Sequence, residues 1–330
     1  GSVFAVPDVS AKPAMAEIRL STRSSLTASL SLLNQPPFNF MTKADRPVDL
    51  GEGRAEIETR LSLPLQKKIA LGDVSYSVTG RVLGFSSDKL VPGRKIVADT
   101  LAVGATPAGL TIKGAGRLGT VPFDVTFAQG FGADQKGRAT IAGELVLSQA
   151  VAEEFGLGLP RGMVSGQGRA AVDITLTKNA PGELRLRSDL AGIGLGLPEI
   201  GWRKSPEKKG TLEAEVTLGA VPRVNRLTID AGGLKADGDV TLRAGGGLDR
   251  ARFGRVTLDD WLDASVELTG RGAGKAVGIA LTAGSVDIRH MPGADARGTS
   301  TNGQGSGPLR LDLDRLIVTS SIALTRFRGS

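Results

Sequence analysis

The chain has 330 residues, of which 40% are hydrophobic and 23% charged, and this composition excludes a disordered polymer. Its net charge is +7, and no run of about 18 apolar residues is present, which excludes a helix that spans a membrane. It has no cysteine and one histidine, His290, so thiolate chemistry and most histidine-dependent catalysis are excluded as well.

In the first half of the chain, apolar and polar residues alternate with period two, which is typical of half-buried strands. The alternation predicts strands over Leu26–Leu32, Ala55–Leu61 and Val121–Phe127. One helix is predicted from Gln149 to Phe155, with Ser148 capping its start and Gly156 ending it.

The second half repeats the alternation more regularly, between short connections at 231–233 and 243–247. Such connections favour antiparallel hairpins, because parallel crossovers need about a dozen residues or more. We therefore predict an all-β fold: a long, curved antiparallel sheet, taco-like, with an open hydrophobic groove and at most one or two short helices. The strands expected here are Leu212–Leu218, Leu227–Ile229, Leu234–Leu242, Leu262–Leu268, Val277–Leu281, Val286–Ile288 and Leu309–Leu313.

Three stretches are rich in Pro, Gly or charge and are predicted to be irregular: 34–50, 202–210 and 291–308. None is long enough to separate independent domains, so residues 1–330 are interpreted as one continuous segment of a larger protein. A possible sub-boundary lies near 203–210, between N-terminal strands in 1–202 and C-terminal strands in 211–330.

Two glycine-rich segments have spacings close to those of nucleotide-binding loops. Residues 114–119 fit G-x-G-x-x-G, but the next residues predict a strand where a dinucleotide loop needs a helix, so we expect a hairpin. Residues 270–276 resemble a phosphate loop only superficially, because Thr269 and Ala276 replace the required Gly and Ser or Thr. No cofactor is predicted.

Catalytic and metal sites are equally poorly supported. On a strand, Ser285 and Asp287 would share one face and His290 would point to the other, which does not make a triad. Asp312 and Asp314 share a strand face but are too few to hold calcium. We expect no catalytic residue and no metal, and hence no enzyme.

Basic clusters occur at 67–68, 203–204, 208–209 and 250–255, with few aromatic residues between them. A surface for single-stranded nucleic acid would interleave aromatics for stacking, so no nucleic-acid partner is predicted. Lys and Arg at solvated sheet edges, where they discourage edge pairing, are the preferred interpretation.

The wording and order of the later strands resemble a known family. Phrases such as VNRLTIDAGGLKADGDVTL (Val224–Leu242), GLDRARFGRVTLDDWLDASVELTGRG (Gly247–Gly272) and PLRLDLDRLIVTSSIALTRFRG (Pro308–Gly329) resemble the AsmA-like superfamily of bacterial envelope proteins, in particular the YhdP–TamB type. The resemblance covers about residues 195–330. Before that, only strand rhythm and LSQAVAEEFGLGLP (Leu147–Pro160) fit.

This resemblance implies a periplasmic segment of a protein anchored in the inner membrane of a Gram-negative bacterium. Its groove would carry phospholipid acyl chains between the inner and outer membranes. The alternative is a structural β-sandwich module of the cell envelope that binds a protein partner and no lipid. The residues expected to line a lipid groove are Leu212, Val216, Leu218, Leu234, Val240, Leu242, Val266, Leu268, Ile279 and Leu281.

Overall fold

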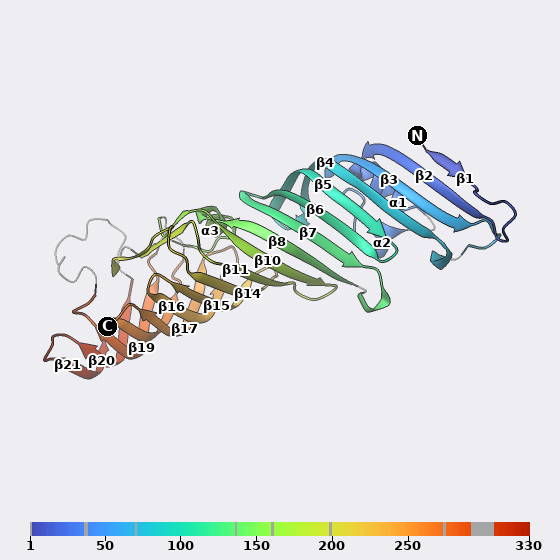
Figure 1. Cartoon of the computed structure of the whole chain (residues 1–330). Coiled ribbons are helices and arrows are strands. Elements are labelled where there is room, and N and C mark those ends of the chain that lie inside the picture. The colour runs from blue at the N-terminus through green and yellow to red at the C-terminus, as the bar shows by residue number, and fades with distance from the viewer. Residues whose placement is uncertain are drawn as a thin grey trace. The chain divides into compact units, whose positions relative to one another are not determined.

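The computed structural model describes residues 2–35, 39–69, 71–135, 137–159, 162–197, 200–272, 275–291 and 307–330. Strands take 61% of the chain and helices 8%. Eighteen strands belong to a largely antiparallel, open sheet, and three more form a small second sheet (Figure 1). The predicted all-β class is therefore confirmed. The chain divides into two compact units, unit 1 (1–143 and 176–178) and unit 2 (144–175 and 179–330), so the predicted sub-boundary near 203–210 lies inside unit 2.

Unit 1 is an antiparallel succession of strands in which each pairs with the next along the chain. Two short helices, α1 (Leu26–Leu33) and α2 (Phe40–Lys43), lie between its second and third strands. Its strands are β1 (Val3–Ala5), β2 (Met15–Ser25), β3 (Glu52–Pro64), β4 (Ser75–Val91), β5 (Arg94–Thr106), β6 (Gly109–Leu118), β7 (Val121–Gly130) and the start of β8 (Arg138–Leu147).

The glycine-rich segment 114–119 lies in β6 and in its turn to β7, with Leu118 opposite Val121. No helix follows it, which confirms the predicted hairpin. Gly119 has φ = 56°, in the left-handed region that glycine tolerates best, so the turn explains this glycine without a ligand.

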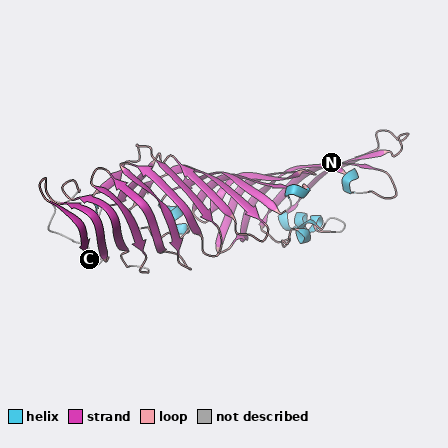
Figure 2. Cartoon of the chain, turned by 90° about the horizontal axis from the view of Figure 1, so that it is seen from below, coloured by secondary structure: helices cyan, strands magenta, loops and turns pink. Residues whose placement is uncertain are grey.

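Unit 2 contains the helix α3 and a second succession of strands, which lie side by side in Figure 2. Most pairs are antiparallel, as the short connections predict. The elements are α3 (Gln149–Glu154), β10 (Gly168–Thr177), β11 (Glu183–Ser188), β14 (Thr211–Thr217), β15 (Arg223–Ala231), β16 (Leu234–Leu242), β17 (Leu248–Leu258), β18 (Leu262–Thr269), β19 (Gly278–Asp287), β20 (Leu309–Ile317) and β21 (Ala323–Gly329).

The small sheet of unit 2 supplies part of its core. It consists of β9 (Val164–Gly166), β12 (Ile193–Leu197) and β13 (Trp202–Lys204), all antiparallel. Trp202 is 5% exposed and joins a cluster with Leu258, Trp261 and Leu313 of the large sheet. The indole N–H of Trp202 donates to the carbonyl of Gly232 (2.7 Å), which fixes the ring over the β15–β16 turn.

Five sequence predictions about local structure were wrong. The strands predicted at Val277–Leu281 and Val286–Ile288 are one strand, β19, and the stretch 34–50 predicted to be irregular contains the helix α2. Leu26–Leu32 is not a strand but the helix α1, whose start is capped by the Ser25 hydroxyl accepting from Ala28 N–H (3.2 Å). Residues 202–204 are not loop but β13. The pair β19–β20 is parallel rather than antiparallel, because the connection over 288–308 is long enough for a crossover.

The predicted helix near Gln149 is present as α3, with Ser148 at its N-cap position but without a capping hydrogen bond from the Ser148 side chain. The predicted irregular segment 291–308 lies almost entirely outside the described residues. Among the residues that are described, no helix combines the length and the apolar character needed to cross a bilayer.

Candidate functional site

One face of the large sheet in unit 2 is lined by aliphatic residues in continuous register. Cross-strand partners point to the same face, so partner positions can be followed from strand to strand. One such series crosses nine strands, from β10 to β20, and every member is aliphatic. We call it the open row: Ile174, Leu184, Val216, Val224, Val240, Ala251, Leu268, Ile279 and Leu309.

A second series runs beside the open row, on the same face and over the same nine strands. We call it the bordering row: Val172, Leu186, Ala214, Leu227, Gly238, Phe253, Val266, Leu281 and Leu311. Phe253, Val266, Leu281 and Leu311 pack against the core that contains Trp202. The bordering row therefore marks the limit of the core.

The open row has a different environment. None of its members belongs to, or packs against, the described hydrophobic clusters of unit 2. Ile279 is 37% exposed and Leu309 47%, although the two are opposite each other in β19 and β20. Ala251 in the middle of the row is buried, at 3% exposed, and the remaining members are half-buried. A continuous aliphatic surface that lies outside the cores is a candidate site for an apolar ligand.

Unit 1 carries a comparable series on one face. Ile57, Gly80, Val103, Ile112 and Phe127 are successive partners across five strands. Gly80 has no room for a side chain, because a Cβ there would lie 2.4 Å from the carbonyl oxygen of Glu56. The core of unit 1 is small, with Val82, Phe85 and Ala98 as its buried cluster, so the described elements leave much of this face half-buried.

The ten residues predicted to line a groove divide into two groups. Leu212, Leu234, Val266 and Leu281 pack against the cores of unit 2 and contribute to its stability. The other six lie away from those cores and are half-buried or exposed: Val216, Leu218, Val240, Leu242, Leu268 and Ile279. Four of these six belong to the open row, Leu242 lies at the end of β16, and Leu218 directly follows β14.

Five other members of the open row were not among the predicted lining residues: Ile174, Leu184, Val224, Ala251 and Leu309. Leu309 belongs to a predicted strand but was not chosen as a lining residue. Ile174 and Leu184 lie in strands that alternate as regularly as the later ones, in AVDITLT and ELRLR. The alternation could therefore have identified these residues as members of one face. It could not show which residues of neighbouring strands lie opposite each other.

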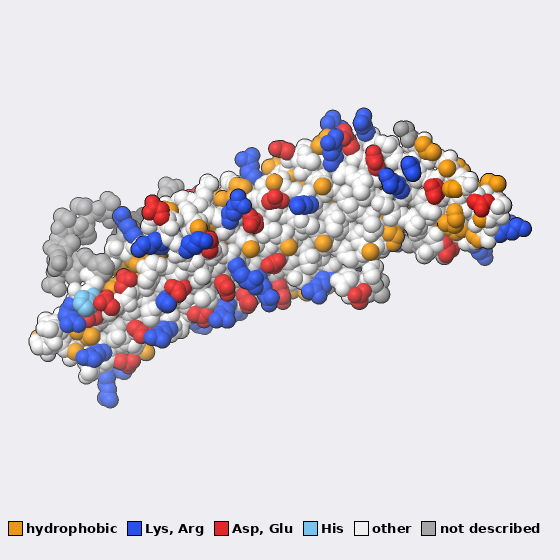
Figure 3. Space-filling view, viewed as in Figure 1, with side chains coloured by type: hydrophobic (Ala, Val, Ile, Leu, Met, Phe, Trp, Pro, Cys, Tyr) orange, Lys and Arg blue, Asp and Glu red, His pale blue; other side chains and the backbone are white. Residues whose placement is uncertain are grey.

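The opposite face of unit 2 is polar, and several of its charges form ion pairs. Arg255 and Asp263 form a two-point ion pair (2.8 and 2.7 Å), and Arg226 pairs with Asp237 (3.0 Å). Hydrogen bonds from Thr228 and then from Arg226 lower the pKa of Asp237. Figure 3 shows Lys and Arg interspersed with Asp and Glu over these strands. The arginines of the 250–255 cluster are exposed, but β17 pairs with β16 on one side and with β18 on the other, so the predicted position at a sheet edge is wrong for this cluster.

The basic pair at 203–204 departs from that expectation. Lys204 is 2% exposed, and its ammonium donates to the carbonyls of Leu190 (2.6 Å), Ile193 (2.7 Å) and Ser205 (3.2 Å). Its neighbour Arg203 points out of the small sheet, because side chains alternate along a strand. Burial lowers the pKa of Lys204, and the carboxylate of Asp189 opposes that effect.

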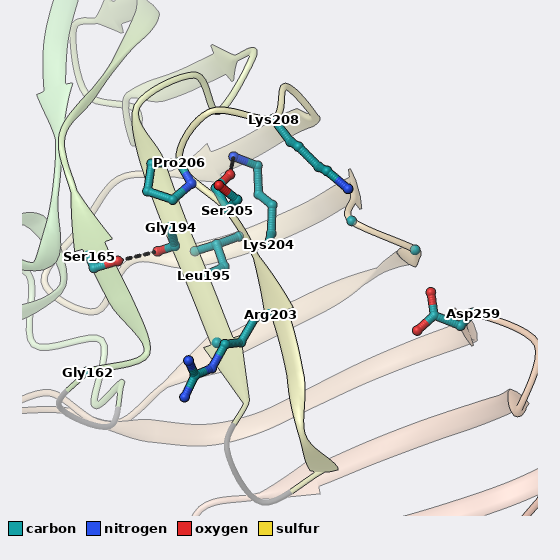
Figure 4. A pocket seen from close by; sticks show the side chains of 13 residues that line it. Gly162, Ser165, Gly194, Leu195, Arg203, Lys204, Ser205, Pro206, Lys208 and Asp259 are labelled. Carbon is teal, nitrogen blue, oxygen red and sulfur yellow. Dashed lines mark hydrogen bonds between the residues drawn. The ribbon is translucent and has the colours of Figure 1, made fainter. Parts of the chain in front are cut away.

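A polar hollow of about 800 Å³ lies beside Lys204 (Figure 4). Its wall includes Arg203, Lys208 and Asp259, and the Ser165 hydroxyl donates to the carbonyl of Gly194 (3.4 Å). Arg203 and Lys208 point in different directions in Figure 4. The hollow therefore lacks convergent cations and does not make an anion site.

The position of His290 also differs from the prediction, which placed its ring on the opposite strand face from Asp287. Its Nδ1 lies 3.2 Å from Asp260 and 3.7 Å from Asp287, because β19 ends at Asp287 and the following turn brings the ring back. Asp287 accepts from the Arg289 guanidinium (2.8 Å), which lowers the pKa of the Asp287 carboxyl to about 2. No cluster of three or more His, Asp or Glu suited to a metal ion occurs among the described residues.

Comparisons with protein-family models, with curated proteins and with solved structures find no match for this chain.

Proposed function

We propose that this chain is a segment of a lipid-transfer protein whose open row binds the acyl chains of phospholipids. The observation that carries the proposal is the open row: nine aliphatic side chains in register outside the two hydrophobic clusters of unit 2, of which Ala251 alone is buried and Ile279 and Leu309 are exposed. A folded chain rarely leaves so continuous an apolar surface without an apolar partner.

The dimensions of the open row suit an acyl chain. Neighbouring strands lie about 4.8 Å apart, so a row over nine strands extends for about 38 Å. One leaflet of a bilayer core is about 15 Å thick, which is the length of one acyl chain in place. A chain that lies across the strands would therefore cover about three strand intervals and leave room for others.

The energetics favour binding without a fixed position. Each methylene removed from water contributes about 0.8 kcal/mol, so a chain of about sixteen carbons gains on the order of 12 kcal/mol when fully covered. An open face covers an acyl chain on one side only, so it provides only part of that free energy. Because every strand offers a similar aliphatic side chain, the binding free energy changes little from one strand to the next, and a bound chain can move along the row.

The AsmA-like resemblance of residues 195–330 supports the same function and adds a setting. In that setting the segment lies in the periplasm of a Gram-negative bacterium, within a protein anchored in the inner membrane. It passes phospholipid between the inner and outer membranes without catalysis. No group in the open row is polar, which is consistent with binding rather than chemistry.

Native mass spectrometry of the purified chain, followed by lipid extraction, tests the proposal. We expect phospholipid to copurify with the chain, and a fluorescent phospholipid to bind to delipidated protein. A folded chain that neither carries nor takes up phospholipid would contradict the proposal. It would favour the alternative, a structural β-module that binds a protein partner.

A pair of variants on one strand makes the test specific. Ile279→Asp places a carboxylate in the open row, where it displaces about three methylenes and costs about 2.4 kcal/mol, roughly fiftyfold in affinity for a chain bound over β18–β20. Ala280→Asp adds the same charge to the opposite face of β19, between Glu267 and Arg310, and should leave binding unchanged. Ile279 is 37% exposed, so both variants should keep the β content of the parent chain by circular dichroism.

A further inference from the structure

Exposed apolar side chains gather at one end of unit 1. Figure 3 shows hydrophobic side chains, with Lys, Arg, Asp and Glu among them, at the end of the chain that holds β1, β2 and β3. Two loops contribute to this end: residues 6–14, between β1 and β2, and residues 65–69, directly after β3. We call the two loops the tip.

The strand register fixes the two loops of the tip beside each other. Met15 begins β2 and Pro64 ends β3, and the two are opposite each other in the antiparallel pair. The N–H of Leu65 donates to the carbonyl of Ala14 (2.7 Å), which continues the pairing into the loops. The tip is therefore a defined part of unit 1.

Several aliphatic side chains at the tip are highly exposed, although contact with water is unfavourable for such side chains. Val9 is 82% exposed, Leu65 46% and Ile69 43%, and Met15 at the base of the tip is 40% exposed. Val9 comes from one loop, Leu65 and Ile69 come from the other, and Met15 begins β2, so the exposed apolar side chains are concentrated at this end of unit 1.

Lysines accompany these apolar residues. Lys12, Lys67 and Lys68 are exposed, and none has an ion-pair partner within the part of the chain that the structure describes. The acidic residues nearby accept hydrogen bonds from neighbouring residues of the chain. Asp8 accepts from the Ser10 N–H (2.8 Å) and hydroxyl (2.6 Å), and Asp73 accepts from the Gln66 amide (3.3 Å).

We propose that the tip docks on the surface of an anionic bilayer. Aliphatic side chains flanked by lysines match a surface whose interior is apolar and whose headgroups are negative. A protein partner is a poorer match, because protein interfaces favour Trp, Tyr and Arg and the tip has none of these. Docking is independent of the open row, since the tip belongs to unit 1 and the open row to unit 2.

Sedimentation of the full chain with vesicles tests the proposal. We expect binding to vesicles of phosphatidylcholine mixed with phosphatidylglycerol, weaker binding to phosphatidylcholine alone, and loss of the difference at high salt. The double variant K67E/K68E should bind mixed vesicles at least about tenfold more weakly, and Val9→Asp or Ile69→Asp should also release the chain.

Matched controls come from unit 2. Lys208→Glu changes an exposed lysine, and Val221→Asp changes a side chain that is 43% exposed, so each should leave vesicle binding unchanged. Equal loss in these controls, or unaltered binding by the tip variants, would overturn docking through the tip. Tip variants that release vesicles yet retain copurified phospholipid would separate docking from acyl-chain binding. A chain without copurified lipid that still docks would leave the tip supported and refute the open row.

Discussion

The buried Lys204 has an unusual environment. Its ammonium is surrounded by three carbonyls, and no carboxylate contacts it. The three acceptors come from the segment before β12, from β12 itself and from the residue after β13, so one side chain ties the small sheet together. A charged side chain is expensive to bury unless hydrogen bonds replace its water, and here three of them do.

Lys204→Met is expected to lower the free energy of unfolding by about 3 kcal/mol, because it leaves three carbonyls without the ammonium that they now bind. Urea denaturation followed by Trp fluorescence measures the change, since Trp202 lies in the same strand. Lys208→Met removes an exposed lysine of the following loop and should change stability by less than about 0.5 kcal/mol. Equal effects of the two substitutions would contradict a clamping role for Lys204.

The carboxyl of Asp287 makes the stability of the folded chain depend on pH, and the shift of its pKa fixes the direction. The pKa of its carboxyl is about 2 in the folded chain, against 3.8 without the Arg289 interaction, so between these values the unfolded chain binds more protons. The stabilisation by Asp287 is complete above pH 3.8 and is lost as the pH falls toward 2. The thermal midpoints of the parent chain and Asp287→Asn should therefore differ at neutral pH and converge below pH 4. A difference that is constant with pH would contradict this account.

At the scale of elements, the regular strands could be predicted and the exceptions could not. Leu234–Leu242 was predicted to the residue, because alternation defines the strand and the turns at 231–233 and 243–247 delimit it. Residues 26–33 satisfy two periods: Leu26, Ala28, Leu30 and Leu32 alternate, while Leu26, Leu30 and Leu33 share a helical face. Pattern alone cannot choose between these two periods.

The Ser25 cap is what favours the helical alternative. Its hydroxyl accepts from the N–H of Ala28, so Ser25→Ala should lower the stability of unit 1 by about 1 kcal/mol. Amide hydrogen exchange over 26–33 should report the same change as faster exchange. Ser21→Ala, at a strand position opposite Glu58, is the control and should leave exchange in α1 unaltered. An effect of equal size at Ser21 would assign the loss to β2 and not to the cap.

Residues of the candidate site could be predicted only as far as their face. Alternation identified Val216 and Leu212 alike, yet Leu212 packs against a core whereas Val216 lies in the open row. What separates them is the small sheet, whose strands β9, β12 and β13 are only three to five residues long. Strands so short contain too few alternating positions to be recognised in the sequence. The sequence therefore could not show which part of the aliphatic face the small sheet covers.

At the scale of the whole molecule, burial differs between the units. Among the described residues, seven buried hydrophobic side chains lie in unit 1 and seventeen in unit 2. Hydrophobic burial is the main favourable contribution to folding, so unit 1 depends more on whatever covers its half-buried face. If acyl chains cover the apolar faces, their removal should therefore affect unit 1 first.

We expect the amides of β4–β7 to exchange faster than those of β16–β18 in delipidated protein, because local stability follows local burial. Adding a short-chain phospholipid at about a hundred times its dissociation constant should stabilise the lipid-binding unit by about 2.7 kcal/mol. Hydrogen exchange with and without lipid measures both effects. Because Ile279→Asp weakens binding at the β18–β20 end of the open row, it should reduce protection by lipid in these strands and leave protection in unit 1 unchanged. Protection that is uniform over the chain, or that is unaltered in β18–β20 of this variant, would show that lipid acts elsewhere than on the open row.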